Sequence, residues 1–439
     1  MRTLFFLIAL ATAISDPVNA QTWVRTYYDS AGIKLKEEYQ ILGSDSNQVH
    51  GNYVKFHENG APAVTGQFDN GTKYGEFREY YADSSILRIT HFENGKRQGA
   101  VLAYADNGTL VQEAFFNRDT LQGSLITYYP DGSLKSKTNF VQGKPDGTIL
   151  EYYQNGNLKN EIAYRQGEPN GISRKYYPNG KLRSEADYVN GLVNGDFRTY
   201  YDNGQLDTES RLDQGEKSGQ FKSYNQEGQL VLIGNYQKGL LVGENKGFYP
   251  NGALKHAYYY QNGKRTGEAL KYYADSTVME RAIYSRSEKD SKTTEYFQGG
   301  SIKAEKETRD GMPVGQWKYY YFNGTLKAEE TYSVGKLEEK ITFDSLGIKQ
   351  SQQPFLQNLP HGIAKTYYPE GSLKEEITYK LGKKTGPYIS FHPGGQAAVK
   401  GEYLKDQEIG VWNHYDEKGQ PVKKTTYQRG KVVEEQELR

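Results

Sequence analysis

Short runs of alternating apolar and polar residues recur along this chain with a period of 24 residues. One copy, residues 195–212, has two runs rich in Thr, Tyr, Phe and Leu on either side of Asn203-Gly204. Two such runs around Asn-Gly are typical of a β-hairpin. Helix is excluded, because two or three glycines per copy and the adjacent tyrosines fit no 3.6-residue stripe. Each copy is therefore predicted to form one hairpin.

The period is clearest at the turn glycine. We count 17 turn positions, with one residue deleted between Gly324 and Gly347. They are Gly32, Gly60, Ser84, Gly108, Gly132, Gly156, Gly180, Gly204, Gly228, Gly252, Ser276, Gly300, Gly324, Gly347, Gly371, Gly395 and Gly419. A short repeated unit cannot bury its own apolar face and must stack on its neighbours. The predicted fold is therefore all-β: an elongated array of about 17 β-hairpin repeats, or about 34 strands, in one long twisted antiparallel sheet.

Opposite charges predict the pairing register within a hairpin. If Tyr201 faces Leu206 across the turn, Arg198 faces Glu209, and this opposite-charge pair favours the register. A slip of one residue would bring like charges together and turn every side chain to the other face. The same register pairs Asp196 with Arg211, Arg174 with Glu185, Lys318 with Glu329, Lys365 with Glu376, and Glu79 with Arg88.

Prolines precede several of the turn positions, at a site that should donate a hydrogen bond in a two-residue hairpin. They are Pro130, Pro178, Pro250, Pro369 and Pro393. We therefore expect a four-residue connection with proline at the second position of a type I turn.

Adjacent tyrosines should point to opposite faces of the sheet, because strand side chains alternate. In the register above, the second tyrosine shares its face with the leucine of the return strand, and the first tyrosine faces a cation. The expected tyrosine–cation pairs are Tyr128 with Lys135, Tyr152 with Lys159, Tyr176 with Arg183, Tyr320 with Lys327, and Tyr367 with Lys374. The repeats around 285–294 and 350–359 depart from the pattern and are candidate bends or ligand-facing irregularities.

Charge and cysteine content narrow the class of protein. The 55 Lys and Arg residues and 54 Asp and Glu residues leave a net charge of +1, with both signs interleaved. This predicts no electrostatic footprint for nucleic acid or for an anionic membrane. The chain has no cysteine, so stability must come from the strand ladder and side-chain rows.

The first 20 residues have the order of a secretory signal peptide. Arg2 precedes the apolar run 4–14, which is too short to span a bilayer, and small residues at 18–20 fit cleavage after Ala20. We therefore predict two regions, a signal peptide over 1–20 and a repeat array over 21–439. The mature chain is expected to be exported to the periplasm or the medium, without membrane insertion after cleavage.

No residue pattern predicts catalysis. His50 and His361 precede hairpin glycines in a slot that Asn and Ser fill elsewhere, and His57 and His392 stand in tyrosine slots, so we interpret them as structural. No metal-ligand spacing occurs in the sequence. A carboxylate pair for hydrolysis would need a cleft, which a single-layer sheet lacks. We expect no enzyme activity and no cofactor-binding or metal site.

The string Tyr-Tyr-x-Asn-Gly-x-Leu-Lys-x-Glu, followed by Tyr-x-x-Gly-Lys-x-x-Gly, occurs with minor changes over residues 176–195 and over 367–386. It resembles the bacterial variant of the MORN repeat, and the resemblance covers nearly all of the mature chain. It implies a row of β-hairpins that serves as a scaffold or binding surface. Some bacterial proteins of this repeat type are antitoxins.

We expect a non-catalytic exported scaffold that binds a protein partner along its sheet. The alternative is binding of a cell-envelope glycan through a tyrosine row, and a weaker alternative is an antitoxin or immunity role. The candidate binding surface consists of Tyr128, Tyr152, Tyr176, Tyr320 and Tyr367 with Lys135, Lys159 and Arg183.

Overall fold

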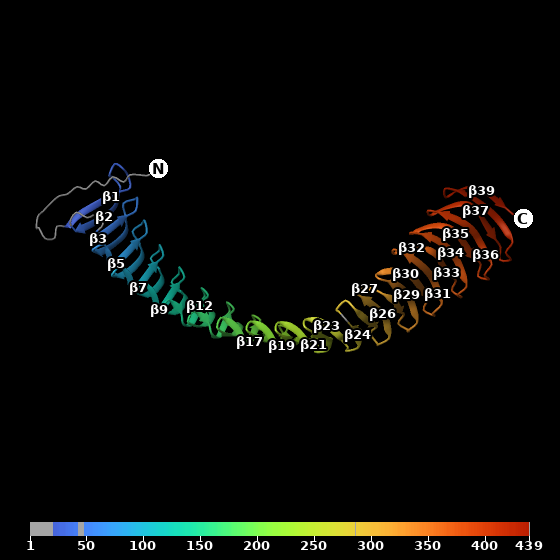
Figure 1. Ribbon diagram of the computed structural model, residues 1–439, viewed down its shortest axis with the longest axis horizontal. Coiled ribbons are helices and arrows are strands. Elements are labelled where there is room, and N and C mark those ends of the chain that lie inside the picture. The colour runs from blue at the N-terminus through green and yellow to red at the C-terminus, as the bar shows by residue number, and fades with distance from the viewer. Residues whose placement is uncertain (1–20, 43–47, 286, 439) are drawn as a thin grey trace. The chain divides into compact units, whose positions relative to one another are not determined.

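The computed structural model describes residues 21–42, 48–285 and 287–438, and all regular structure within these ranges is β (Figure 1). The predicted signal peptide over 1–20 lies outside the described residues. The 39 strands belong to one open antiparallel sheet. Four of them are two-residue segments that a bulge separates from the next strand, so the described strands make 17 hairpins and one further strand, β39 (Lys431–Glu437). The predicted all-β array of hairpins is confirmed.

The described residues form two units. The first runs to Lys217 and includes Gln226–Gly228, and the second consists of Ser218–Asn225 and the residues from Gln229 onward. The strands of the first unit are β1 (Gln21–Tyr27), β2 (Leu35–Leu42), β3 (Val49–Phe56), β4 (Pro62–Asp69), β5 (Thr72–Tyr80), β6 (Ile86–Glu93), β7 (Lys96–Tyr104), β8 (Leu110–Asn117), β9 (Thr120–Tyr128), β10 (Leu134–Val141), β11 (Lys144–Pro145), β12 (Gly147–Tyr152), β13 (Leu158–Arg165), β14 (Glu168–Pro169), β15 (Gly171–Tyr176), β16 (Leu182–Val189), β17 (Leu192–Tyr200) and β18 (Leu206–Asp213).

The second unit has most of β19 and all of the strands after it. These are β19 (Glu216–Tyr224), β20 (Leu230–Gln237), β21 (Leu240–Phe248), β22 (Leu254–Gln261), β23 (Lys264–Tyr272), β24 (Val278–Tyr284), β25 (Ser291–Tyr296), β26 (Ile302–Arg309), β27 (Met312–Pro313), β28 (Gly315–Tyr320), β29 (Leu326–Ser333), β30 (Lys336–Phe343), β31 (Lys349–Leu356), β32 (Leu359–Pro360), β33 (Gly362–Tyr367), β34 (Leu373–Lys380), β35 (Lys383–Phe391), β36 (Ala397–Leu404), β37 (Gln407–Tyr415), β38 (Pro421–Gln428) and β39.

The charge-based register is correct over most of each hairpin. Arg198 pairs with Glu209 in β17 and β18, and the four other repeats tested in this way have the predicted pairs. Near the turn the prediction is wrong by one residue, because Leu206 faces Tyr200 and Asp207 is an extra, bulged residue. The same bulge recurs in the return strands, for example between Leu134 and Ser136 of β10. It changes the neighbours of both tyrosines.

Two kinds of turn alternate along the chain. Within a hairpin, the Gly204 N–H donates to Tyr201 O at 2.9 Å and the Tyr201 N–H donates to Gln205 O at 2.8 Å. Gly204 has a φ of +90°, so the loop fits a type I turn followed by a left-handed glycine. Pro178 holds the second position of the equivalent turn, as predicted, although the loop is one residue shorter than the four expected. Between hairpins, Asn190-Gly191 forms a two-residue turn with positive φ at both residues.

A glycine bulge opens the regular hairpins. Ala186 pairs with Phe197 and Tyr188 pairs with Val193, so residues 194–196 of β17 face Asp187 alone. Gly195 within this bulge has a φ of +139°, which favours glycine. Bulges of this kind increase the local twist of a strand pair.

The bulge is missing from the hairpin connection between β24 and β25. These strands pair without interruption from Glu280 opposite Glu295 to Tyr284 opposite Ser291. The irregularity predicted around 285–294 is therefore confirmed. The one predicted around 350–359 is wrong, because Gly362 has the usual positive φ of +90° and the usual bulge.

A tyrosine hydroxyl links each regular hairpin to the next. The second tyrosine of a pair donates to the carbonyl oxygen of the first tyrosine in the following hairpin, as from Tyr177 to Tyr200 O at 2.7 Å and from Tyr153 to Tyr176 O at 2.9 Å. His392 makes the equivalent bond to Tyr415 O at 2.9 Å. Its place in a tyrosine slot is thus structural, as predicted, and His57 behaves in the same way.

One face of the sheet, here called the core face, holds all of the buried side chains among the described residues. They include Phe77, Val101, Ala114, Ala186 and Trp412, and Val101 and Ala114 are partners across adjacent strands. Large and small residues complement each other on this face. A Cβ atom at Gly401, for example, would clash with the ring of Trp412. In each unit the main contacts join strands that are neighbours in the row, so the sheet is a single layer.

Candidate functional site

The core face has a centre row, formed by the middle residue of each strand. Along β5 to β8 it reads Phe77, Thr90, Val101 and Ala114. Every described centre-row position of the first unit is uncharged. In the second unit, Lys306, Glu330 and Lys340 bring charge into this row. The glycine bulge is absent or reduced in the same part of the chain.

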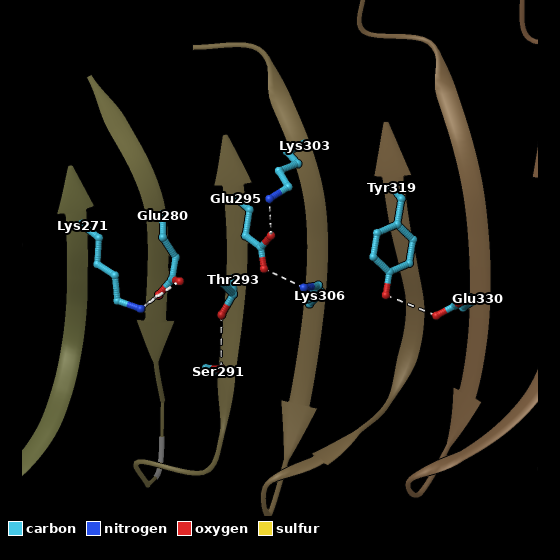
Figure 2. A network of polar contacts seen from close by, with 9 residues as sticks. All are labelled: Lys271, Glu280, Ser291, Thr293, Glu295, Lys303, Lys306, Tyr319 and Glu330. Carbon is cyan, nitrogen blue, oxygen red and sulfur yellow. Dashed lines mark hydrogen bonds and ion pairs between the residues drawn. The ribbon is translucent and has the colours of Figure 1, made fainter. Parts of the chain in front are cut away.

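Charged residues around these three form a continuous polar group on β23 to β30, here called the charged segment. Its members come from seven strands, and Figure 2 shows the side chains of those that it labels on one face of these strands. They are Lys271, Glu280, Glu295, Lys303, Lys306, Tyr319, Glu330, Tyr332 and Lys340.

Glu330 is the most enclosed carboxylate of the charged segment, with 13% of its side chain exposed. It accepts the ammonium group of Lys340 at 2.9 Å and the hydroxyls of Tyr332 and Tyr319 at 2.8 and 3.2 Å. Burial by itself would raise the pKa of Glu330. The hydrogen bonds and the charge of Lys340 outweigh burial, so the pKa lies below the ordinary value for glutamate.

The tyrosines that contact Glu330 are held in the neutral state. Burial, followed by the hydrogen bond to Glu330, raises the pKa of Tyr332 to about 12. The pKa of Tyr319 is raised in the same direction by burial and by the charge of Glu330. Both hydroxyls therefore remain donors to the carboxylate at neutral pH.

Lys306 is held between a carboxylate and aromatic rings. Its Nζ lies 2.6 Å from Glu295 Oε1, and it stands 5.6 and 5.7 Å from the ring centroids of Trp317 and Tyr319. Lys303, the bulged residue of β26, lies 3.8 Å from the other Glu295 oxygen (Figure 2). Two cations thus share one carboxylate.

Lys271 and Glu280 extend the charged segment to β23 and β24, with the Nζ atom 3.0 Å from the carboxylate. Burial would lower the pKa of Lys271, but the hydrogen bond and the charge of Glu280 outweigh it and the pKa is raised. Glu280 also stands directly opposite Glu295 in the strand ladder. Like charges in that position are unfavourable, so each carboxylate depends on its own lysine.

The predicted tyrosine–cation pairs are wrong, and the bulge of the return strand is the reason. Lys135 stands over the second tyrosine, Tyr129, at 5.7 Å, and not over Tyr128. The other four cations make the same exchange. The cation is itself the bulged residue of the return strand. In a ladder without the bulge it would face the first tyrosine, and with the bulge it contacts the second tyrosine.

The candidate binding residues therefore lie in two different groups. Lys135, Lys159 and Arg183 are exposed and contact the hydrogen-bonded second tyrosines Tyr129, Tyr153 and Tyr177. The first tyrosines are half-buried at the strand ends, and two of them donate to carboxylates, Tyr176 to Glu161 at 3.2 Å and Tyr320 to Glu305 at 2.6 Å. Tyr128, Tyr152 and Tyr367 are likewise half-buried.

The sequence analysis missed the charged segment altogether. Its residues are far apart in the sequence. A comparison of the residue type at the centre position of every repeat would have shown where charged residues replace uncharged ones. In the described part of the chain, no group of three or more His, Asp or Glu side chains is placed to hold a metal ion. No described helix is long and apolar enough to cross a membrane.

Comparison with known proteins identifies the repeat. The model of the MORN repeat variant family matches six stretches, residues 121–142, 145–166, 169–190, 193–211, 313–333 and 360–381. These six stretches are MORN repeats of the variant type. No curated protein matches it in sequence.

Solved structures that are similar to this chain include two toxin complexes. A complex of TcdB2, TccC3 and Cdc42 is 12% identical over 94% of this chain and 26% of its own, with a TM-score of 0.14. A Tc holotoxin pore of Photorhabdus luminescens is also 12% identical, over 95% of this chain and 26% of its own, with a TM-score of 0.15. A protein of unknown function from Bacteroides caccae is 16% identical over 52% of this chain and 88% of its own, with a TM-score of 0.13. The chain thus spans about a quarter of the toxin-complex chains that it matches.

Proposed function

We propose that this MORN-repeat protein is a non-catalytic, exported scaffold that binds a protein partner along the core face of its sheet. The observation that supports this most directly is that the core face holds the buried apolar side chains of the described residues, while the sheet is a single layer. Apolar surface arranged in a continuous row is typical of a surface that another protein covers.

An aromatic row supplies the apolar contacts of the proposed surface. In the first unit Tyr53, Phe68, Phe77 and Phe92 follow one another with ring centroids 5.1–5.4 Å apart. In the second unit Tyr388, Tyr403, Trp412 and Tyr427 form a similar series at 5.1–5.7 Å. Aromatic side chains contribute much of the binding energy at protein interfaces. We favour a protein partner over a glycan because the first tyrosines lack the cations that the glycan hypothesis assigned to them.

Site-specific photo-crosslinking in intact cells tests the proposal. A benzophenone amino acid is placed at Tyr188 or Tyr379, which lie on the core face two residues after centre-row positions, or at the matched exposed positions Ile172 and Ile363 on the opposite face. We expect one discrete crosslinked protein from both core-face positions and none from the two controls. Equal crosslinking from both faces, or none from the core face, would contradict the proposal.

Export is tested separately. Because residues 1–20 have the order of a signal peptide, the native protein should begin at Gln21 and be absent from the cytosol. Mass spectrometry of the protein from fractionated cells measures this. Recovery of the intact first 20 residues from the cytosolic fraction would contradict export.

A further inference from the structure

We propose that the charged segment of β23 to β30 binds an acidic stretch of the partner protein and thereby selects the partner. This inference rests on the proposed function, since it names the chemistry that a partner on the core face must present. It rests also on how the charges of the segment are oriented, which is independent of the aromatic row.

Three of the four lysines of the charged segment are more exposed than the carboxylates that hold them, and the fourth, Lys306, is as exposed as Glu295. Lys340 is 42% exposed and Glu330 is 13% exposed. Lys271 is 40% exposed against 26% for Glu280, and Lys303 is 51% exposed against 25% for Glu295. The carboxylates are therefore turned into the sheet, and the outer surface of each pair is its ammonium group.

A wholly apolar partner would be disfavoured at this place. Each of Lys271, Lys303 and Lys340 is paired with a carboxylate on the side of its ammonium group that faces the sheet and is hydrated on the other side. Apolar groups of a partner would remove this water, and the desolvation of each ion is costly. Carboxylates of a partner would replace that water and also complete the pairing. Outside the charged segment, Glu435 of β39, opposite Thr425, is the one charged residue among the described centre-row positions, so apolar contacts meet no such obstacle over most of the row.

The spacing of the lysines sets a requirement on the partner. Lys271, Lys303 and Lys340 lie on β23, β26 and β30, and neighbouring strands stand about 4.8 Å apart. An acidic segment that crosses the strands can therefore reach all three in succession. A single carboxylate cannot, so the segment would select for several acidic residues in a row.

The test uses the full chain and short labelled peptides in which Phe alternates with Glu, Gln or Lys. The binding variant carries Lys271→Gln, Lys303→Gln and Lys340→Gln. The control variant carries Lys292→Gln, Lys318→Gln and Lys365→Gln on the opposite face, which changes the net charge equally. Fluorescence anisotropy at low and high salt gives the dissociation constants. Hydrogen exchange over β23 to β30 verifies that both variants remain folded.

We expect the Phe-Glu peptide to bind the parent chain more tightly than the Phe-Gln peptide, and high salt to remove the difference. The binding variant should lose affinity for the Phe-Glu peptide about tenfold, as three exposed ion pairs together predict. The control variant should bind like the parent, and neither variant should change binding of the Phe-Gln peptide.

Other outcomes overturn the inference in distinguishable ways. If the binding variant holds the Phe-Glu peptide as tightly as the parent, the lysines do not select acidic partners, although a core-face partner found by crosslinking would stand. If no peptide binds and crosslinking also fails, the proposed function itself is wrong. If alginate, and not the Phe-Glu peptide, binds the parent and is lost in the binding variant, the ligand is an anionic glycan and the acidic protein segment is excluded.

Discussion

The strands around Phe77 in the first unit and those around Glu330 in the second have the same ladder but opposite chemistry on the core face. Phe77 is 4% exposed and contacts the rings of Phe68 and Phe92. Glu330 occupies the equivalent centre-row position in its strand and is surrounded by an ammonium group and two hydroxyls. Backbone pairing sets the fold in both places, and the centre row is therefore free to specify what the surface binds.

The glycine bulge is lost between β24 and β25 and reduced between β29 and β30, whereas Gly315 of β28 keeps its positive φ and its place opposite Tyr332. In regular hairpins a bulge glycine stands opposite a large residue, as Gly219 does opposite Tyr236. In the charged segment Ser291 stands opposite Thr308, and their hydroxyl oxygens lie 3.1 Å apart. At this position a cross-strand pair of glycine and an aromatic residue is thus replaced by two residues with hydroxyl groups. The residues of both strands differ from those of a regular hairpin.

Truncating Phe77 should cause the largest effect on stability. The Phe77→Ala variant should lower the local free energy of unfolding by about 3–5 kcal/mol, because the buried ring leaves a cavity. In a repeat array this loss should raise hydrogen exchange in β4 to β7 and leave β15 to β18 unchanged. Phe115→Ala, at a 48% exposed position on the opposite face, is the control and should cost less than about 1 kcal/mol. Uniform loss of protection throughout the first unit would contradict local coupling.

Removing Glu330 should cost less, and the loss should be recoverable. Glu330→Leu leaves Lys340 and two tyrosine hydroxyls without their acceptor, which should cost about 1–3 kcal/mol. Combining it with Lys340→Met should restore most of the loss, because an apolar pair needs no partner. Chemical denaturation of the single and double variants measures the difference. A double variant that is less stable than Glu330→Leu would show that the charges are required for folding.

The pH dependence should separate the two regions further. The folded pKa of Glu330 is lowered, so its contribution to stability is present above the unfolded value of about 4.3 and is lost as pH falls through the lower folded value. Tyr332 behaves oppositely, because its raised pKa makes a contribution that is lost as pH rises from about 10 through about 12. Hydrogen exchange against pH should show both losses in β28 to β30. Glu330→Gln should abolish the acid loss, and an unchanged acid profile would contradict its assignment.

The smallest predicted effect is a gain at the turn between β29 and β30. Val334 has a φ of +42° and is 65% exposed, whereas Asn190 holds the equivalent position with a φ of +50° in the first unit. A β-branched residue is strained in this conformation and Asn tolerates it. Val334→Asn should therefore raise the free energy of unfolding by about 1 kcal/mol. Val189→Asn, in a strand, is the control and should give no gain, and equal gains in both would contradict turn strain as the cause.

Sequence reasoning predicted what depends on period and local chemistry. The hairpin repeat, the pairing of Arg198 with Glu209 and the place of Pro178 in its turn follow from residues that are close in sequence. The bulge at Asp207 was missed, because one unpaired residue leaves the surrounding charge pairs unchanged and only exchanges the roles of the two tyrosines.

The charged segment could not be derived in the same way. Lys306, Glu330 and Lys340 contact their charged partners at separations of only 10 or 11 residues, but the whole set extends from Lys271 to Lys340 and no single repeat contains it. Opposite-charge pairing within one hairpin predicts contacts between two adjacent strands only. A row that continues over many strands becomes visible only when the register, with its bulges, is known.

The hydroxyl link between hairpins has a consequence for how such a chain can evolve. Tyr177 bonds a main-chain carbonyl of the next hairpin, and a main-chain carbonyl is present whatever side chain stands there. A duplicated or deleted hairpin therefore meets a neighbour that already offers the acceptor, and His392 shows that the donor itself can be exchanged. The gene can lengthen or shorten by whole repeats without a compensating substitution at this contact, which leaves the centre row of each new copy free to diverge.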